Sequence, residues 1–222
     1  MYIIVVGAGQ IGTPLINIAT SEGHEVVVIE HDSARANQIA QQFDCMVLHS
    51  DGTSMETLEE AGAQEADALI STTDRDAVNL MVCLLALEYK IRHVVSVVRD
   101  ADHMNIFRHV GVHVMENPQR LIAEHLFRAV SHPPVGDYIR LESGAEVFEV
   151  EVSEQAPIAG LTLDQANDEG LLPADMQVVV IERPDAGITL PSGDTELQSG
   201  DYLIVYAPGG VDRSVMDTFG SG

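Results

Sequence analysis

Lysine is almost absent from this sequence, since Lys90 is the only one in 222 residues, and there is no tryptophan. The other ten of the 11 basic residues are arginines, against 35 acidic residues, and the formal net charge is −24. Binding to nucleic acid or to anionic lipid depends on Lys and Arg meeting phosphates, so this composition argues against both. Loss of lysine with retention of arginine predicts an acidic surface adapted to a salt-rich, halophilic cytoplasm, where salt screens the repulsion between carboxylates.

Long hydrophobic runs and cysteines are also scarce. No segment approaches the run of about 18 apolar residues that a membrane span needs, and no basic stretch precedes an apolar one near Met1. We therefore expect no membrane insertion and no signal peptide. The two cysteines, Cys45 and Cys83, are expected to be reduced, packed thiols of a cytoplasmic protein. Hydrophobic residues make up 45% of the chain, enough for two modest domains with their own cores.

The first part of the chain predicts short apolar strands in strict alternation with helices. Strands are expected at 3–6, 25–30, 45–48, 67–71, 93–98 and 112–115, and helices at 11–22, 34–42, 54–62, 77–90, 102–109 and 119–130. Ser33 is expected to cap the second helix. Strands without polar positions, such as Ile-Ile-Val-Val at 3–6, are typical of a buried parallel sheet. Residues 1–130 therefore predict an α/β, Rossmann-type doubly wound parallel sheet.

The pattern changes around Pro133 and Pro134, and we predict a linker at residues 131–137. Beyond it, strands are expected at 146–152, 177–182 and 202–206, a short helix at 162–167, and tight turns at 191–194 and 199–201. Residues 138–222 thus predict a small mixed, largely antiparallel α/β domain.

A glycine-rich motif follows the first strand and opens a helix. It reads Gly7-Ala8-Gly9-Gln10-Ile11-Gly12, and Glu30 closes the second strand 18 residues beyond Gly12. In such a motif the first glycine permits a tight turn, the second lets the backbone approach phosphates, and the third lets the helix pack closely. The amides that open the helix favour phosphate. A carboxylate at Glu30 would accept hydrogen bonds from a ribose and repel a 2′-phosphate, which favours NAD(H) or ATP/ADP over NADP.

Other strand ends should line the same crevice. Residues 51–53 follow the third strand, where an adenine would lie, and residues 72–74 follow the fourth, near the phosphates. Asp51 could instead form a turn or cap a helix, and Arg99, which ends the fifth strand, could instead pair with a neighbouring acid. The candidate nucleotide-contacting residues are Gly7, Gly9, Gln10, Ile11, Gly12, Glu30, His31, Asp51, Gly52, Thr53, Thr72, Thr73, Asp74 and Arg99. His31 stays open between ligand contact and a solvent-facing role.

The order of these motifs resembles the RCK family, the regulators of potassium conductance, and within it the TrkA/KtrA-type subunits of potassium uptake systems. In the first domain the resemblance is carried by residues 7–12, Glu30, Ser50-Asp51-Gly52-Thr53 and residues 71–79. In the second it is carried by residues 157–163, 190–195 and 200–203. It covers nearly the whole chain, and the pairing of the two domains is more specific than either domain alone.

The resemblance implies a regulatory subunit and not an enzyme. Such subunits bind ATP, ADP or NAD(H) as a regulatory ligand and form homodimers that assemble into a larger ring. The ring lies on the cytoplasmic side of the membrane, peripheral to it, under a TrkH- or KtrB-like potassium transporter. The ligand gates transport if it binds one ring geometry better than the other. Several relatives bind cyclic di-AMP in the C-terminal domain, which stays an open expectation here.

Two positions depart from the family pattern. Some relatives carry an arginine in the glycine loop that reaches a phosphate on the partner subunit, where this chain has Gln10. Some carry an acidic cation ligand just after the proline that follows the sixth strand, where this chain has Gln119. Discrimination of the third phosphate of ATP is therefore left open, and no metal site is predicted.

Two alternative functions stay open. The chain could regulate another ion transporter, because the partner is not encoded in a nucleotide site. It could also be an NAD-dependent oxidoreductase, which needs a donor–acceptor group beside the nicotinamide. His109 and His113 straddle Gly111 at a predicted helix end, which removes a shared metal-binding face, and no GxSxG nucleophile motif is present. We therefore predict no catalytic residue.

Overall fold

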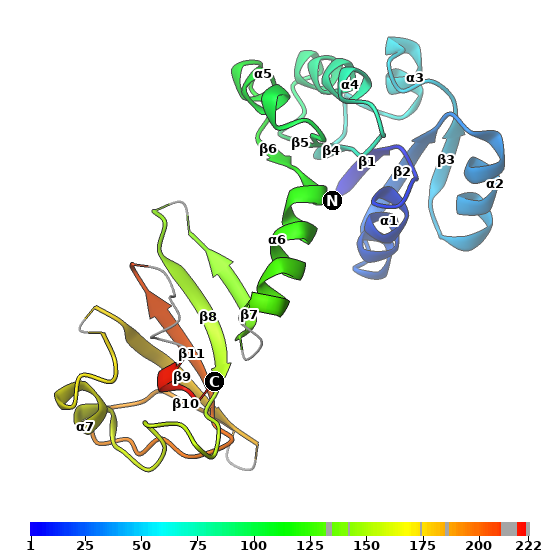
Figure 1. Cartoon of the computed structure of the whole chain (residues 1–222). Coiled ribbons are helices and arrows are strands. Elements are labelled where there is room, and N and C mark those ends of the chain that lie inside the picture. Colours follow the sequence, from blue (N-terminus) through cyan, green and yellow to red (C-terminus); the bar gives the residue numbers. More distant parts are fainter. Residues whose placement is uncertain (132–134, 142, 174, 185–186, 210–216, 221–222) are drawn as a thin grey trace. The chain divides into compact units, whose positions relative to one another are not determined.

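The computed structural model describes residues 1–131, 135–141, 143–173, 175–184, 187–209 and 217–220. The chain divides into two compact units, Met1–Ile122 and Ala123–Gly222, each with its own sheet (Figure 1). The dividing point falls inside a helix, whereas the boundary expected from the sequence, at residue 130, lies near the end of that helix. Among the described residues, no helix has both the length and the apolar character to span a membrane.

The first unit holds six parallel strands in the order β3-β2-β1-β4-β5-β6, the order of a Rossmann-type sheet. The strands are β1 (Tyr2–Val6), β2 (Glu25–Glu30), β3 (Met46–His49), β4 (Ala68–Ser71), β5 (His93–Val97) and β6 (Val114–Glu116). The helices are α1 (Gly12–Ser21), α2 (Ser33–Gln42), α3 (Met55–Glu60), α4 (Asp76–Glu88), the 3-10 turn η1 (Ala101–His103), α5 (Met104–His109) and α6 (Pro118–Ser131). The predicted strand–helix alternation is confirmed.

Both faces of this sheet are buried, which explains the strands without polar positions. Ile3 and Val5 of β1 face one core, with Ile16 of α1 and Ile39 of α2. The opposite core contains Leu58 of α3, Val82 and Cys83 of α4, and Phe107 of α5, packed against residues such as Ile4 and Val6. Alternate residues of one strand thus contribute to two cores. Figure 1 shows the helices that supply these cores around the sheet.

Two local predictions in the first unit need correction. Asp32, and not Ser33, is the N-cap of α2, because its Oδ1 accepts a hydrogen bond from the Arg35 amide at 2.8 Å. The helix expected at 102–109 begins as η1, with Asp100 accepting from the Asp102 amide, before it continues as α5. Both cysteines are free thiols, as predicted, and burial raises the pKa of Cys83 to about 11 against an opposing hydrogen bond from Ser96.

The second unit holds an antiparallel sheet in the order β10-β9-β11-β8-β7. Its elements are β7 (Val135–Arg140), β8 (Glu146–Glu151), α7 (Leu163–Asp168), β9 (Gln177–Arg183), β10 (Gly187–Thr189) and β11 (Tyr202–Ala207). Thr162 and Gln165 form a capping box at the start of α7. One face of the sheet packs on a core that includes Phe148, Leu163 and Leu203.

The sequence missed two strands of this unit. β7 begins at Val135, inside the predicted linker, and pairs with β8, for example Ile139 with Val147. β10 is three residues long and pairs with β9. Both are edge strands, so their apolar signal is weaker than that of the central strands. The middle of the predicted linker, residues 132–134, lies outside the described residues.

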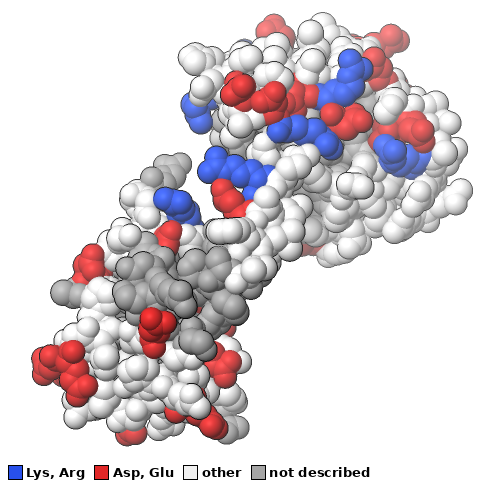
Figure 2. All heavy atoms as spheres, viewed as in Figure 1, with Lys and Arg blue, Asp and Glu red and all other residues white. Residues whose placement is uncertain are grey.

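Acidic side chains are spread over both units and are not confined to one patch. On the face that Figure 2 draws, acidic side chains lie beside basic ones on the first unit and in separate groups on the second unit. This distribution agrees with the expectation of a generally acidic surface.

Candidate functional site

The glycine turn after β1 brings backbone against backbone at the carboxyl edge of the sheet. Gly7 has a φ of 94°, and a Cβ on it would lie 3.1 Å from the Thr73 amide nitrogen. A Cβ on Gly12 would collide with the carbonyl oxygen of Gly7. A Cβ on Gly9 would meet no atom within 4 Å. Gly7 and Gly12 therefore close the turn, whereas Gly9 leaves a stretch of backbone open to the space above it.

Glu30, at the end of β2, is bound by backbone amides on two sides. Its side chain is 1% exposed, Oε2 accepts from the Ala8 amide at 2.7 Å, and Oε1 accepts from the Asp32 amide at 2.9 Å. Burial acts to raise the pKa of Glu30, but these two hydrogen bonds and the charges of Arg35 and His31 outweigh burial and lower the pKa. The ionised carboxylate thus ties the glycine turn to the loop after β2.

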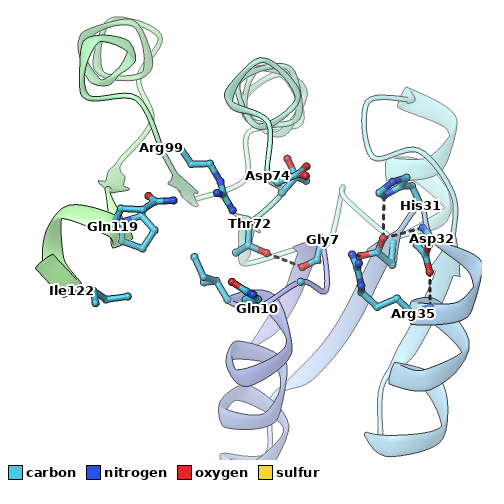
Figure 3. A pocket seen from close by; sticks show the side chains of 15 residues that line it. Gly7, Gln10, His31, Asp32, Arg35, Thr72, Asp74, Arg99, Gln119 and Ile122 are labelled. Carbon is cyan, nitrogen blue, oxygen red and sulfur yellow. Dashed lines mark hydrogen bonds and ion pairs between the residues drawn. The ribbon is translucent and has the colours of Figure 1, made fainter.

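Two exposed cationic or potentially cationic groups flank this carboxylate. His31 Nδ1 lies 3.0 Å from Glu30 Oε1, and Arg35 Nη1 lies 3.5 Å from Glu30 Oε2. Their side chains are 80% and 43% exposed. The loop after β2 therefore does not present a bare carboxylate, because Arg35 and two backbone amides offset the charge of Glu30. Figure 3 shows His31, Asp32 and Arg35 around this point.

The loop after β3 is a turn held by Asp51. Its Oδ1 accepts from both the Thr53 amide at 2.9 Å and the Thr53 hydroxyl at 2.8 Å. These hydrogen bonds lower the pKa of Asp51. A Cβ on Gly52 would lie 2.5 Å from Val6 Cγ1, so a larger residue would displace this loop from the end of β1. Asp51 thus forms the turn, and because it also lines a cavity, its contact with a ligand stays a prediction.

The hydroxyls after β4 bind protein groups. Thr72 is 6% exposed and donates to the carbonyl oxygen of Gly7 at 2.7 Å (Figure 3). Thr73 donates to Oδ1 of Asn79 at 2.6 Å. Thr72 thus fastens the glycine turn to β4, and Thr73 is fixed from below by α4.

Asn79 is a buried amide that sequence reasoning did not single out as a site residue. It is fully buried, and its Oδ1 also accepts from the Ser71 hydroxyl at 2.8 Å and the Thr73 amide at 3.1 Å. Its Nδ2 donates to the carbonyl oxygens of Thr73 and Val97, at 3.2 and 3.0 Å. Every hydrogen-bonding group of the amide is used, so the ends of β4 and β5 are held together through one side chain.

The loop after β5 is held by Asp76, at the start of α4. The Asp76 carboxylate accepts from the amides of Arg99 and Asp100, at 2.9 and 3.0 Å, and Oδ2 lies 2.8 Å from His103 Nδ1. Burial acts to raise the pKa of Asp76, but the hydrogen bonds outweigh it and lower the pKa. The hydrogen bond to Asp76 raises the pKa of His103.

Two cavities that share lining residues open above these loops. The larger, of about 590 Å³, is lined by Gly7, Gly9, Gln10, Ile11, Glu30, His31, Asp32, Arg35, Thr72, Thr73, Asp74, Arg99, Pro118, Gln119 and Ile122. The smaller, of about 350 Å³, is lined by Val6, Gly7, Ile29, His31, Ser50, Asp51, Gly52, Thr53, Thr73, Asp74, Arg75 and Val78. Gly12, packed below the turn, is the one predicted contact residue that lines neither cavity.

Three arginines from different strand ends line these cavities: Arg35, Arg75 and Arg99. Figure 3 shows Arg35 on the β2 side of the larger cavity and Arg99 with Gln119 on the opposite side. Sequence reasoning proposed Arg99 but missed Arg35 and Arg75. The available signal was position, since each lies in or next to the first turn of a helix that follows a strand of the sheet. In the part of the chain that the structure describes, no group of three or more His, Cys, Asp or Glu is placed to hold a metal ion.

The TrkA-N domain matches residues 3–118, and the TrkA-C domain matches residues 147–219. The chain belongs to the TrkA family. It is 30% identical over 206 residues to the Trk system potassium uptake protein TrkA homolog of Methanothermobacter thermautotrophicus, covering 92% of this chain and 93% of that protein. It is 31% identical over 214 residues to the corresponding homolog of Pyrococcus abyssi, covering 93% and 92%. The family resemblance inferred from the motifs is confirmed.

Solved structures agree with this TrkA fold. The GsuK channel bound to NAD superposes with a TM-score of 0.65 at 19% identity, over 93% of this chain and 37% of that one. GsuK bound to ADP superposes with a TM-score of 0.54 at 22% identity, over 59% of this chain and 35% of that one. At these identities the likeness shows the fold, and the TrkA chain spans about a third of GsuK.

Proposed function

We propose that this TrkA-family chain is a regulatory subunit that binds an adenine nucleotide, NAD(H) or ATP/ADP, and thereby gates a membrane potassium transporter. The observation that carries the proposal is the convergence of Arg35, Arg75 and Arg99 on two cavities beside an open glycine backbone. Carboxylates line the same cavities, but in a chain with a net charge of −24 three arginines beside the open amides of a helix start are the groups that favour an anionic ligand.

The ligand would occupy both cavities. Its phosphates would lie over Gly9, Gln10 and Ile11, where amides at the start of α1 favour negative charge. Its adenine would enter the smaller cavity, between apolar side chains such as Val6 and Val78. Its ribose would lie at the loop after β2, where its hydroxyls would replace the exposed side chains of His31 and Arg35 at the second acceptor site of each Glu30 oxygen. The titles of two solved structures with this fold name NAD and ADP as their ligands, which supports the same ligand class.

The nucleotide would act as a signal. Its binding energy would be used to shift an equilibrium between assembly states, which requires different affinities for those states. The close relatives are named as potassium uptake proteins, and this supports a potassium transporter as the partner. We place the chain at the cytoplasmic face of the membrane, held there by that partner.

A second copy of the chain would cover α6. Among its described side chains, the exposed apolar residues are Leu121, Ile122, Leu126, Phe127 and Val130, with exposed fractions of 51% to 82%. An apolar stripe of this length on a helix is typical of an association surface. A homodimer through α6 would be the unit of the larger ring.

A thermal-shift panel in multimolar KCl tests the ligand, with ATP, ADP, NAD⁺, NADH, NADPH and cyclic di-AMP. A nucleotide at 100 times its dissociation constant should add about 2.7 kcal/mol to the free energy of unfolding. We expect this from at least one adenine nucleotide without a 2′-phosphate, and we expect Glu30→Ala to abolish it. Glu60→Ala removes an exposed carboxylate at the end of α3 and should leave the shift unchanged. Stabilisation by NADPH alone would contradict the assigned role of Glu30.

Nucleotide-dependent rubidium flux through the co-purified transporter, reconstituted in vesicles, tests gating. Flux that is the same with and without a bound nucleotide would contradict the regulatory role. Substrate-dependent NADH oxidation would point instead to an oxidoreductase.

A further inference from the structure

The backbone of Arg99 is held on both sides by side chains from other elements. Its amide donates to Oδ1 of Asp76 at 2.9 Å, and its carbonyl oxygen accepts from Nδ2 of Asn117 at 2.7 Å. The side chain of Arg99 is exposed and reaches into the larger cavity (Figure 3). A cationic side chain whose backbone is fixed in this way needs little ordering when an anion arrives.

Asn117 uses both ends of its amide. While Nδ2 binds Arg99, Oδ1 accepts from the amide of Arg120 at 2.9 Å, the hydrogen bond of an N-cap at the start of α6. In addition, Pro118 and Gln119 of the first turn of α6, and Ile122 just after that turn, line the same cavity as Arg99. One side chain therefore connects a cavity-lining arginine to a cavity-lining helix start.

Asp76 anchors the other side of Arg99. Its carboxylate also accepts from the Asp100 amide and contacts His103, and its side chain is 8% exposed. Its neighbour Arg75, next to the first turn of α4, lines the smaller cavity. The position of Arg99 is thus set between α4 and α6, two helices that each contribute to the binding region.

We propose that Asp76 and Asn117 are positioning residues for Arg99, whose side chain binds the negatively charged part of the ligand. Through Asn117, ligand binding in the cavity would then stabilise the first turn of α6. This proposal rests on the proposed nucleotide function and names its route of regulation. A ligand that fixes Arg99 strengthens the Asn117 contact, and Asn117 in turn stabilises the helix start. The coupling is limited to the free energy of one hydrogen bond. Ligand binding should therefore change the equilibrium constant for opening of the first turn of α6 by about 2- to 10-fold.

Hydrogen–deuterium exchange on the full chain, with and without saturating NAD⁺ or ADP, tests the route. The dissociation constant is measured on the same samples. Two variants separate the two bonds of Asn117: Asn117→Asp keeps the cap acceptor and loses the donor to Arg99, and Asn117→Ser does the same without adding charge. Asn105→Asp and Asn105→Ser are the matched controls, because Asn105 is exposed on α5 and lines neither cavity.

In the wild type, nucleotide should slow exchange at amides 120–122 by about 3-fold or more. Asn117→Ser should lose this slowing and, because the coupling is reciprocal, weaken nucleotide binding by about 2- to 10-fold. Arg99→Gln should weaken binding about 10-fold through the lost charge. The Asn105 variants should behave as the wild type.

If nucleotide binds the wild type without slowing exchange at amides 120–122, the route is overturned. The route is also overturned if both Asn117 variants keep the wild-type slowing. Absence of binding to the wild type would overturn the proposed function and this route with it. The two failures are distinguishable because affinity and exchange are read separately.

Discussion

Buried polar side chains serve different purposes in the two units. Among the described residues of Met1–Ile122, four of the six buried polar residues, Glu30, Ser71, Thr72 and Asn79, gather at the carboxyl ends of β2 and β4, or just below them on α4, and hold the loops that line the cavities. In the described part of Ala123–Gly222, the buried carboxylate of Asp201 serves the sheet instead. A buried polar group therefore indicates a binding region when its partners are cavity-lining loops.

The ion pair of the second unit shows the contrast. Asp201 is 2% exposed, and its oxygens accept from Nε and Nη2 of Arg183 at 2.8 and 3.1 Å and from the Gln198 amide at 2.9 Å. Arg183 also donates to the carbonyl oxygen of Glu196. These partners lie on β9 and on the turn before β11, so the pair fixes a turn to the sheet.

The largest expected effect comes from Asn79→Leu. The substitution keeps the volume but leaves the Ser71 hydroxyl and the Thr73 and Val97 backbone groups without their partner, which should cost about 3 kcal/mol of folding stability. Because Thr73 and the end of β5 then move, nucleotide affinity should fall more than 10-fold, or about 1.4 kcal/mol. Chemical denaturation and calorimetric titration measure the two quantities.

Cys83→Ala, a fully buried change on the same helix, is the control for Asn79→Leu. It should lower stability and leave affinity unchanged. Equal losses of affinity in both variants would mean that Asn79 acts only through general stability.

Arg183→Met should break the ion pair between Arg183 and Asp201 in the second unit. The carboxylate of Asp201 would remain buried with only part of its hydrogen bonding, and because the Arg183 side chain is 27% exposed, we expect a loss of about 2 kcal/mol. Nucleotide affinity of the first unit should not change. A loss of affinity as large as that of Asn79→Leu would refute the contrast between the units.

The sequence predicted those features that depend on local rules. The centres of β1 and β2 carry long apolar runs, and Gly7 occupies a backbone conformation that other residues rarely adopt, so both are readable without a structure. The order of motifs was enough to place the chain in its family. Edge strands such as β7 carry a weaker pattern and were missed.

Partners distant in sequence account for most of the rest. Contact of Thr72 with a ligand stays a prediction, but the hydrogen bond of its hydroxyl to Gly7, 65 residues earlier in the chain, was not foreseen. In the sequence, Asn79 is one polar residue in an apolar helix, and its role is seen only from its hydrogen bond to the carbonyl oxygen of Val97. Such pairings are set by tertiary packing, which no spacing rule encodes.

Gly9→Ala should separate binding from folding within the first unit. The added Cβ meets no atom within 4 Å, so stability should change by less than about 1 kcal/mol. It projects from the backbone where phosphates would lie, so affinity should fall about 10-fold or more. Thermal unfolding and titration with ADP provide the measurements. Unchanged affinity would place the phosphates elsewhere. Gly12→Ala, whose Cβ would collide with the Gly7 carbonyl oxygen, should by contrast lower the stability of this unit.

The smallest expected effect is a pH dependence from His103, which is 46% exposed at the side chain. Its folded-state pKa is raised above the ordinary 6.5 by the hydrogen bond to Asp76, so protonated His103 stabilises the loop after β5. This contribution is complete below about pH 6 and is lost as pH rises through the raised pKa. The stability difference between wild type and His103→Gln should therefore shrink between about pH 6 and pH 8. The pKa of Asp76 is lowered, so that carboxylate stays ionised throughout this window. Urea unfolding at a series of pH values measures the difference, and a gap that widens toward pH 8 would show that neutral His103 holds the loop.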